Sequence, residues 1–226
     1  MALTQESKKF WEPDPKLIDW LVKNKIPEGA RVLEVGPGET PFKRANVYVD
    51  VDPPKGLDNC VKANFTDDGL PFADKEFDFI YCRHVLEDLW NPFRICDEMS
   101  RVGKAGYIEG PSPIVECARG VDGGSPPFRG YHHHRWLMWT ANKELRFVSK
   151  YPFIEYVKFV ETEMDELLKT QRYWNTCYLW EDKINYVHRD NNKLDYNIPR
   201  DYAVMLADAM QTSKTYIEDF YFPINT

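Results

Sequence analysis

The sequence lacks the features typical of membrane-spanning proteins, of secreted proteins and of small domains held by disulfides or zinc. No continuous apolar run approaches the roughly 18 residues that a membrane-spanning helix needs. Residues 1–9 lack the apolar core of a secretory signal. The five cysteines are scattered and none forms a Cys-x-x-Cys pair, which argues against a disulfide framework or a zinc ribbon. We therefore expect a reduced, cytoplasmic protein that does not associate with membranes.

Basic residues are also fewer than acidic residues. The chain has 29 Lys and Arg against 36 Asp and Glu, a formal charge of −7. Long nucleic acids need a broad basic face, so we do not expect them as partners. With 226 residues, of which 43% are hydrophobic, the chain can bury a core as a single domain spanning 1–226. Aromatic residues at 15% leave room for a pocket that binds a small molecule, and the oligomeric state is left open.

The first half of the chain alternates helices with short apolar segments. A helix is predicted over 14–25, because Asp14 can cap it and Pro15 suits its first turn. Strands are predicted at 31–35, 47–49, 60–63, 77–82 and 106–109, with a second helix from Asn91 to Gly103. Strands that alternate with helices predict an α/β fold, a Rossmann-like and mostly parallel sheet flanked by helices. Ligands of such sheets bind at the carboxyl ends of the strands.

The second half of the chain has a different pattern. Residues 112–130 are rich in Gly and Pro and predict a long loop. Residues 136–140 and 145–149 flank a short polar turn and predict an aromatic-rich hairpin inserted in the second half. Further along, 162–174 is expected to be helical, 178–188 a strand and 201–217 a helix.

A glycine turn followed by an acidic residue is the strongest chemical signal. The segment VLEVGPG at 32–38 joins a predicted strand to a sharp turn, and Asp50 follows the next strand. Glycine allows a ligand to approach main-chain N–H groups closely. A carboxylate at the end of the next strand can accept hydrogen bonds from both ribose hydroxyls. Together these residues predict an adenosine site.

Three segments carry a resemblance to a known family. They are LEVGPG at 33–38, LPFADKEFD at 70–78 and HVLED at 84–88. The sequence resembles the class I S-adenosylmethionine-dependent methyltransferases of the small-molecule, methyltransferase type 11-like kind. In that family's third segment a histidine is usual where this chain has Asp88. The resemblance covers roughly residues 29–110 and implies S-adenosylmethionine as cofactor.

The resemblance also implies roles for individual residues. Glu34 and the glycine turn would face the methionine part of the cofactor, and Asp50 would hold the ribose hydroxyls. Asn64 and Phe65 would lie at the adenine edge, with Arg83 and His84 near the sulfonium and the acceptor. The full set of implied cofactor-binding residues is Glu34, Gly36, Pro37, Gly38, Asp50, Val51, Asn64, Phe65, Arg83 and His84. The cofactor-binding core would span about 14–110, and a lid or acceptor region about 111–160.

The segment after the glycine turn departs from the family pattern. Thr40 stands at the family's third glycine position, and only residues 39–46 separate the turn from the second strand. A parallel crossover usually needs a dozen or more residues. The connection between the first two strands is therefore predicted to be shortened, here called the trimmed first crossover. A shortened connection and Thr40 would both weaken a cofactor site, so a noncatalytic Rossmann-like binding module is an alternative.

Three consecutive histidines, His132, His133 and His134, follow the Gly/Pro-rich loop. In a strand, His132 and His134 would share one face and could hold a metal with Glu109 or Asp122 as a third ligand. That arrangement defines a second alternative, a metal-dependent enzyme. The preferred interpretation assigns no metal and uses His133 and Glu109 as catalytic residues that take a proton from the acceptor. We thus expect methyl transfer from S-adenosylmethionine to a small acceptor, at oxygen.

Overall fold

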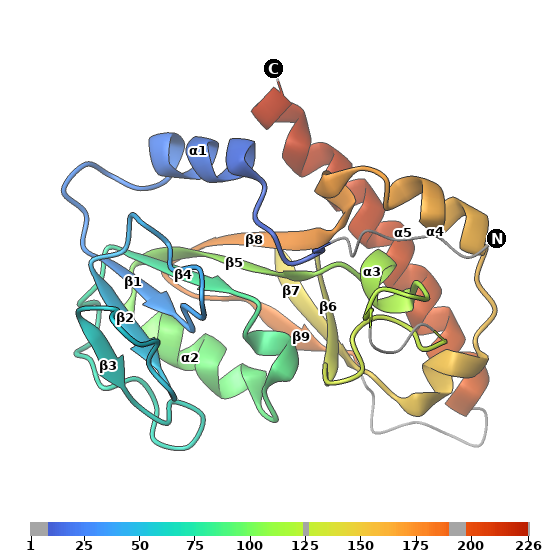
Figure 1. The fold of residues 1–226 in the computed structure, drawn as a ribbon, viewed down its shortest axis with the longest axis horizontal. Helices are drawn as coiled ribbons and strands as arrows, with labels where there is room; N and C mark the ends of the chain where they lie inside the picture. The colour runs from blue at the N-terminus through green and yellow to red at the C-terminus, as the bar shows by residue number, and fades with distance from the viewer. Residues whose placement is uncertain (1–8, 124–126, 190–197, 226) are drawn as a thin grey trace.

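The structure is a computed structural model that describes residues 9–123, 127–189 and 198–225. Its centre is a six-stranded sheet with the strand order β3-β2-β1-β4-β5-β8, parallel except for β8 (Figure 1). This confirms the predicted α/β, Rossmann-like architecture. The strands are β1 (Val32–Val35), β2 (Val47–Asp50), β3 (Cys60–Lys62), β4 (Phe79–Arg83), β5 (Ala105–Pro111) and β8 (Asn175–Glu181).

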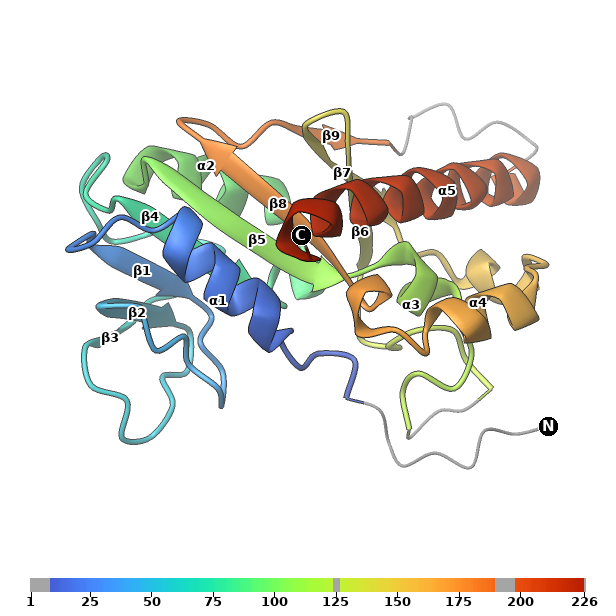
Figure 2. The same ribbon diagram turned by 90° about the horizontal axis from the view of Figure 1, so that it is seen from above.

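Helices cover one face of this sheet. α1 (Pro15–Asn24) begins where the side chain of Asp14 accepts a hydrogen bond from the Lys16 N–H at 2.9 Å, as the sequence predicted. α1 and the long C-terminal helix α5 (Ile198–Asn225) lie over the same face of the sheet (Figure 2). Leu21 of α1 and Tyr202 of α5 belong to one buried cluster with the strand residue Tyr81. The sequence placed the last helix at 201–217, shorter at both ends than the one observed.

The opposite face is covered by a helix and a second sheet. α2 (Pro92–Val102) is capped by Asn91, whose side chain accepts from the Arg94 N–H at 3.3 Å. The small sheet has the order β6-β7-β9, with β6 (Trp136–Ala141) and β7 (Glu144–Ser149) forming the predicted hairpin. Met99 of α2 and Phe147 of β7 are buried in the same cluster as Ile80 of β4.

Three predicted elements of the second half need correction. The single strand predicted at 178–188 is wrong: β8 ends at Glu181, Asp182 takes a positive φ of 60°, and β9 (Tyr186–His188) joins the other sheet. The helix predicted at 162–174 ends early, because α4 covers only Glu161–Leu167. The predicted long loop contains a short buried helix, α3 (Pro113–Cys117), which is capped by the Ser112 hydroxyl.

The connection between β1 and β2 has no helix, since residues 36–46 form only turns. Phe42 of this connection is buried and stacks on Tyr81 of β4, with ring centroids 4.1 Å apart. The trimmed first crossover is therefore confirmed, and an aromatic side chain covers the strands where a helix would otherwise pack. Among the described residues, none of the helices combines the length and the apolar character needed to cross a bilayer.

The two glycines after β1 differ in what surrounds them, and this generates a prediction. Both have positive φ, 71° at Gly36 and 51° at Gly38. A Cβ at Gly36 would lie 2.4 Å from Val85 Cγ2, whereas no described atom lies within 4 Å of one at Gly38. Gly36→Ala should therefore lower the free energy of unfolding by about 2–4 kcal/mol, and the matched control Gly38→Ala by only about 1 kcal/mol. Urea unfolding of both variants measures the difference, and equal losses would contradict the role of Val85.

Candidate functional site

The carboxyl ends of the parallel strands bring the predicted site residues to one edge of the sheet. The Gly36 N–H donates to the Val49 carbonyl at 2.9 Å, so the glycine turn lies beside Asp50. Arg83 pairs with Glu109 across β4 and β5, and the His84 N–H donates to the Glu109 carbonyl at 2.9 Å. Residues predicted from separate motifs therefore meet at one edge.

Glu34 is buried beneath the glycine turn. Its Oε2 accepts a hydrogen bond from the Phe42 N–H at 2.7 Å, which ties the trimmed crossover to β1. Burial raises the pKa of Glu34 to about 7, although the Phe42 hydrogen bond and the charge of Arg83 both act to lower it. The carboxyl group is thus poised to ionise near neutral pH, and a cation bound beside it would favour the ionised form.

Asp50 and its neighbours form the rim of the site. Asp50 is half-buried, and its Oδ1 accepts from the Asp52 N–H at 2.9 Å. Val51 is exposed, and exposed Asn64 binds Asp67 through its amide at 2.7 Å. Phe65 is buried in the core cluster that contains α2. Asp50, Val51 and Asn64 therefore present accessible groups at this rim, while Phe65 anchors its loop.

His84 follows β4 in a conformation that is unusual for a histidine. Its φ is 53°, and its Nδ1 lies 3.0 Å from Glu87 Oε1. Its Nε2 is buried 3.9 Å from Glu109 Oε1 and makes no hydrogen bond within the described ranges. Positive φ at a non-glycine residue costs energy, and such strain concentrates at functional sites. The end of β4 thus holds an imidazole whose Nδ1 is bound by Glu87 and whose Nε2 has no hydrogen-bond partner among the described residues.

Glu109 is the buried acid at the end of β5. Tyr107 donates its hydroxyl to Glu109, Asn175 donates from Nδ2 at 3.2 Å, and Arg83 Nη1 lies 3.7 Å away. These contacts hold the Glu109 carboxyl group in one orientation at the end of β5. Asn175 Oδ1 is buried and, among the described residues, lacks a hydrogen-bond partner.

The segment before α1 passes over this edge. Arg83 donates a hydrogen bond to the Trp11 carbonyl, and the Trp11 ring lies edge-on to Tyr131 at 6.3 Å. Gln171 Nε2 donates to the Glu12 carbonyl at 3.3 Å, which ties the same segment to the second half of the chain. Residues 11–12 therefore link the end of β4 to elements outside the main sheet.

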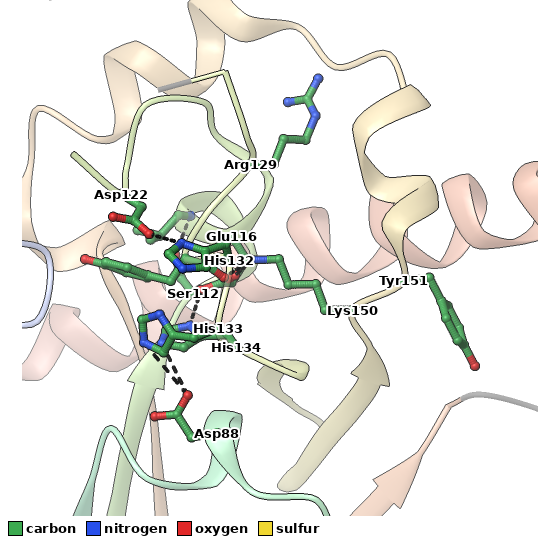
Figure 3. Close-up of polar contacts among 12 residues, drawn as sticks. Asp88, Ser112, Glu116, Asp122, Arg129, His132, His133, His134, Lys150 and Tyr151 are labelled. Carbon is green, nitrogen blue, oxygen red and sulfur yellow. Dashed lines mark hydrogen bonds and ion pairs between the residues drawn. The ribbon is translucent and has the colours of Figure 1, made fainter. Parts of the chain in front are cut away.

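The three histidines lie in a turn, not in a strand, so the predicted pairing of His132 with His134 is wrong. A turn at 131–134 breaks the alternation that would have placed both side chains on one face. His132 contacts Asp122, whereas His134 Nδ1 lies 2.7 Å from Glu116 Oε1 (Figure 3). His133 and His134 pack together, with ring centroids 4.5 Å apart. Glu109 is a ligand in neither of the two His-containing clusters that the described residues form.

Buried charges hold His134 in place. Glu116 is fully buried and accepts from Lys150 Nζ at 2.5 Å as well as from His134. Burial acts to raise the pKa of Glu116, but Lys150 and His134 together lower it. At His134 burial acts to lower the pKa, and the Glu116 contact outweighs this effect and raises it. The more exposed His133 has a lowered pKa, owing to partial burial and to His134 beside it.

Comparison with known proteins identifies the first half of the chain. The profile of the methyltransferase domain family matches residues 20–108, about two fifths of the chain. An uncharacterized protein of Methanocaldococcus jannaschii, MJ1123, is 36% identical over 92 residues, which are 38% of this chain and 44% of that protein. The chain thus covers less than half the length of this relative. Residues 20–108 thus match a methyltransferase domain.

Solved structures with partial similarity also include methyltransferases. YcgJ from Bacillus subtilis is 20% identical, with a TM-score of 0.33 over 42% of this chain and 50% of that one. An S-adenosylmethionine-dependent methyltransferase from Mesorhizobium loti is 14% identical, with a TM-score of 0.36 over 67% and 80%. MccD protein is 15% identical, with a TM-score of 0.40 over 74% and 96%. These scores are low, and the assignment of the methyltransferase domain depends on the family match and the strand order.

The methyltransferase domain implies S-adenosylmethionine as the cofactor, as the sequence predicted. The residues at the sheet edge fit such a group. A Cβ at Gly38 would meet no described atom within 4 Å, so a ligand can approach its main chain. Asp50 uses Oδ1 to accept from the Asp52 N–H, which leaves Oδ2 for a ligand. His84 Nε2 is a buried polar atom that makes no hydrogen bond in the described structure. Glu34, Asp50 and Glu109 are carboxyl groups at this edge, a residue type that suits a cofactor carrying a sulfonium and an ammonium.

Sequence reasoning missed several residues that shape the site. Glu87 holds His84, and Tyr107 and Asn175 hold Glu109. Tyr107 could have been found, because residues two apart in a strand face the same side. Asn175 and Glu116 come from the second half of the chain, where no motif pointed to the site.

The raised pKa of Glu34 predicts a pH-dependent stability. A carboxyl whose pKa is about 7 in the folded protein, against an ordinary value of 4.5, binds its proton more tightly when the chain is folded. Its contribution to stability is therefore fully present below pH 4.5 and is lost as the pH rises to about 7. Relative to Glu34→Gln, the wild-type free energy of unfolding should fall by about 3 kcal/mol between about pH 4.5 and about pH 8. Chemical denaturation across this range measures it, with exposed Glu39→Gln as the control, and a difference that does not vary with pH would contradict the assignment.

Proposed function

We propose that this protein transfers a methyl group from S-adenosylmethionine to a small acceptor, at oxygen. The observation that carries the proposal is the strand register, which aligns the glycine turn, Asp50, Arg83 and Glu109 at one edge of a sheet whose sequence matches the methyltransferase domain family. When bound, the cofactor supplies a methyl group that is already electrophilic. The protein then needs to bind, align and desolvate the reactants.

Each part of the cofactor has a candidate partner at this edge. The main chain of Gly36, Pro37 and Gly38 would receive the methionine part, with Glu34 beneath it. The free oxygen of Asp50 would accept from the ribose hydroxyls, beside exposed Val51. Asn64 would contact the adenine edge, with Phe65 as the buried anchor of its loop.

Arg83 and His84 would lie on the acceptor side of the cofactor. Arg83 joins the Trp11 carbonyl to the Glu109 carboxylate, and His84 is held by Glu87. Both side chains are therefore restrained before any ligand binds. Such restraint reduces the entropy that alignment of two reactants would otherwise cost.

The acceptor region is proposed to lie within residues 111–160. An open cleft there is lined by Trp90, His132, His133, His134, Arg135, Trp136, Ser149, Lys150 and Tyr151. The exposed Trp90 ring carries the Arg135 guanidinium 3.8 Å from its centroid. An aromatic plane, a cation and imidazoles in one cleft favour a small polar acceptor over an extended polymer.

A hydroxyl acceptor must lose its proton as it attacks the methyl group. We propose His133 for this role, because its lowered pKa leaves the imidazole neutral and able to accept a proton near pH 7. Glu109 is the second candidate, and its Oε1 lies 3.9 Å from His84 Nε2. Tyr107, Asn175 and Arg83 already occupy its oxygens, so the buried Glu109 is less accessible to an acceptor than the exposed His133.

Cofactor binding is tested directly by calorimetric titration with S-adenosylhomocysteine, the product form of the cofactor. The wild-type chain should bind it, and Asp50→Ala should weaken binding by about 1–3 kcal/mol through loss of charged hydrogen bonds. Asp52→Ala, an exposed acid two residues away, is the matched control and should bind as the wild type does. Absence of binding to the wild type would favour a noncatalytic module, and equal affinity of Asp50→Ala would refute the ribose role.

The proton-accepting role of His133 predicts a loss of turnover. With small phenols and alcohols as trial acceptors, release of S-adenosylhomocysteine by His133→Ala should fall by about 10²–10⁴-fold, with cofactor affinity unchanged. His132→Ala removes a neighbouring imidazole that contacts Asp122 instead, and it should retain activity. Full activity in His133→Ala would exclude this residue as the base.

A further inference from the structure

One group of side chains has no role in the cofactor site. Asp88, His133 and His134 each direct one potential ligand atom toward the others, and these atoms all lie within 4.8 Å of one another (Figure 3). We propose that these three residues, the Asp–His–His cluster, bind one divalent transition-metal ion of the Zn²⁺ class. The proposal uses none of the cofactor-binding residues, but it shares His133 with the base role proposed above.

The distances are close to those of a metal site. His133 Nε2 and His134 Nε2 each lie 3.9 Å from Asp88 Oδ1. Tetrahedral Zn²⁺ with bonds of about 2.0–2.1 Å separates its ligand atoms by about 3.3 Å. The two separations that involve Asp88 therefore exceed this value by about 0.6 Å, and the separation between the two histidine nitrogens is at most 4.8 Å. Asp88 and His133 can move to close these separations, because their side chains are 44% and 55% exposed.

A second observation independently favours a metal: the way His134 is held. Glu116 Oε1 lies 2.7 Å from His134 Nδ1, and Lys150 Nζ binds the other oxygen of Glu116. This contact places the Nδ1 proton toward Glu116 and directs Nε2 at Asp88, where an incoming ion would replace any proton on Nε2. Histidines that bind metals usually donate their other N–H to a carboxylate in this way. His134 and Glu116 are both buried, so the arrangement is fixed before an ion arrives.

A neighbouring cluster competes for His133 but is less well built. Asp122, His132 and His133 also bring three ligand atoms within 4.8 Å. Both of its histidines are exposed, however, and the close contact between His132 and Asp122 joins an exposed imidazole to a half-buried acid. His133 cannot serve both clusters at once. The buried support from Glu116 therefore favours the cluster with Asp88.

The ligand types define the class of ion. Two imidazoles and one carboxylate suit Zn²⁺ and similar transition metals, whereas Mg²⁺ and Ca²⁺ prefer oxygen ligands alone. Three protein ligands leave a coordination position for water or for an oxygen of a bound molecule. His133 and His134 line the cleft proposed for the acceptor, so such an oxygen could come from the acceptor. An ion there would occupy the His133 lone pair, and metal binding and the base role would then exclude each other.

The test is titration of the tag-free full chain with ZnCl₂, followed by calorimetry and without any cofactor. The wild type should bind one ion per chain. Asp88→Asn and His133→Ala should each weaken binding by about 100-fold or more, above the loss typical of an outer-shell change. His132→Ala and Asp122→Asn are the matched controls and should bind as the wild type does.

Two results would overturn the proposal. One is the absence of saturable Zn²⁺ binding to the wild type. The other is a loss of affinity in His132→Ala or Asp122→Asn as large as that in Asp88→Asn, which would place the ion at the neighbouring cluster. Thermal unfolding gives a second readout, since Zn²⁺ should raise the melting temperature of the wild type but not of Asp88→Asn. Separate titration with S-adenosylhomocysteine distinguishes failure here from failure of the proposed methyl transfer.

Discussion

The parallel pairing of β1 with β2 and β4 is the constraint on which the site depends. Because these strands run in the same direction, the residues that follow each of them arrive at one edge. β5 extends the edge by pairing with β4, and this brings Glu109 beside Arg83. Because β1 and β4 are buried on both faces, a slip of one residue would exchange the side chains that pack on the two faces and would displace the strand-end residues from one another. The chemistry at the edge is thus a consequence of backbone register more than of any single side chain.

The trimmed first crossover changes how the edge is supported. A helix after the glycine turn would bury β1 and direct its N-terminal dipole at a bound ligand. Here Phe42 covers the strands by stacking on Tyr81, and its backbone N–H is bound by Glu34. The short loop at 36–46 therefore covers the strands as a helix would, but it provides no helix dipole for a bound ligand. The consequence is a buried carboxyl group with a raised pKa below the glycine turn, which we propose to bind the cofactor; electrostatic support for a ligand there would come from side chains.

The first half of the chain could be predicted well from the sequence, whereas in the second half only the hairpin of β6 and β7 and the core of the last helix were found. The caps Asp14 and Asn91 and the short apolar strands are local signals, and local signals were enough for the helices and the parallel sheet. The family resemblance is confirmed for residues 20–108. The split of 178–188 into β8 and β9 depends on pairing with β5 and β7, which lie far away in sequence. The pairing of His132 with His134 failed for a related reason, because a turn replaced the strand that the argument assumed.

The two proposed sites are built in a similar way and are joined by one short turn. At the sheet edge, charged groups such as Arg83 and Glu109 neutralise one another and leave His84 Nε2 without a partner among the residues described. Near the cleft, Lys150 neutralises Glu116 and leaves the Nε2 of His134 directed at Asp88. In both sites a buried carboxylate thus holds one imidazole through its Nδ1, Glu87 at His84 and Glu116 at His134. The 3₁₀ turn Leu86–Asp88 connects them, since Glu87 binds His84 and Asp88 faces His133 and His134. A movement of this turn on ligand binding at one site would therefore shift the carboxylate that contacts the histidine of the other site.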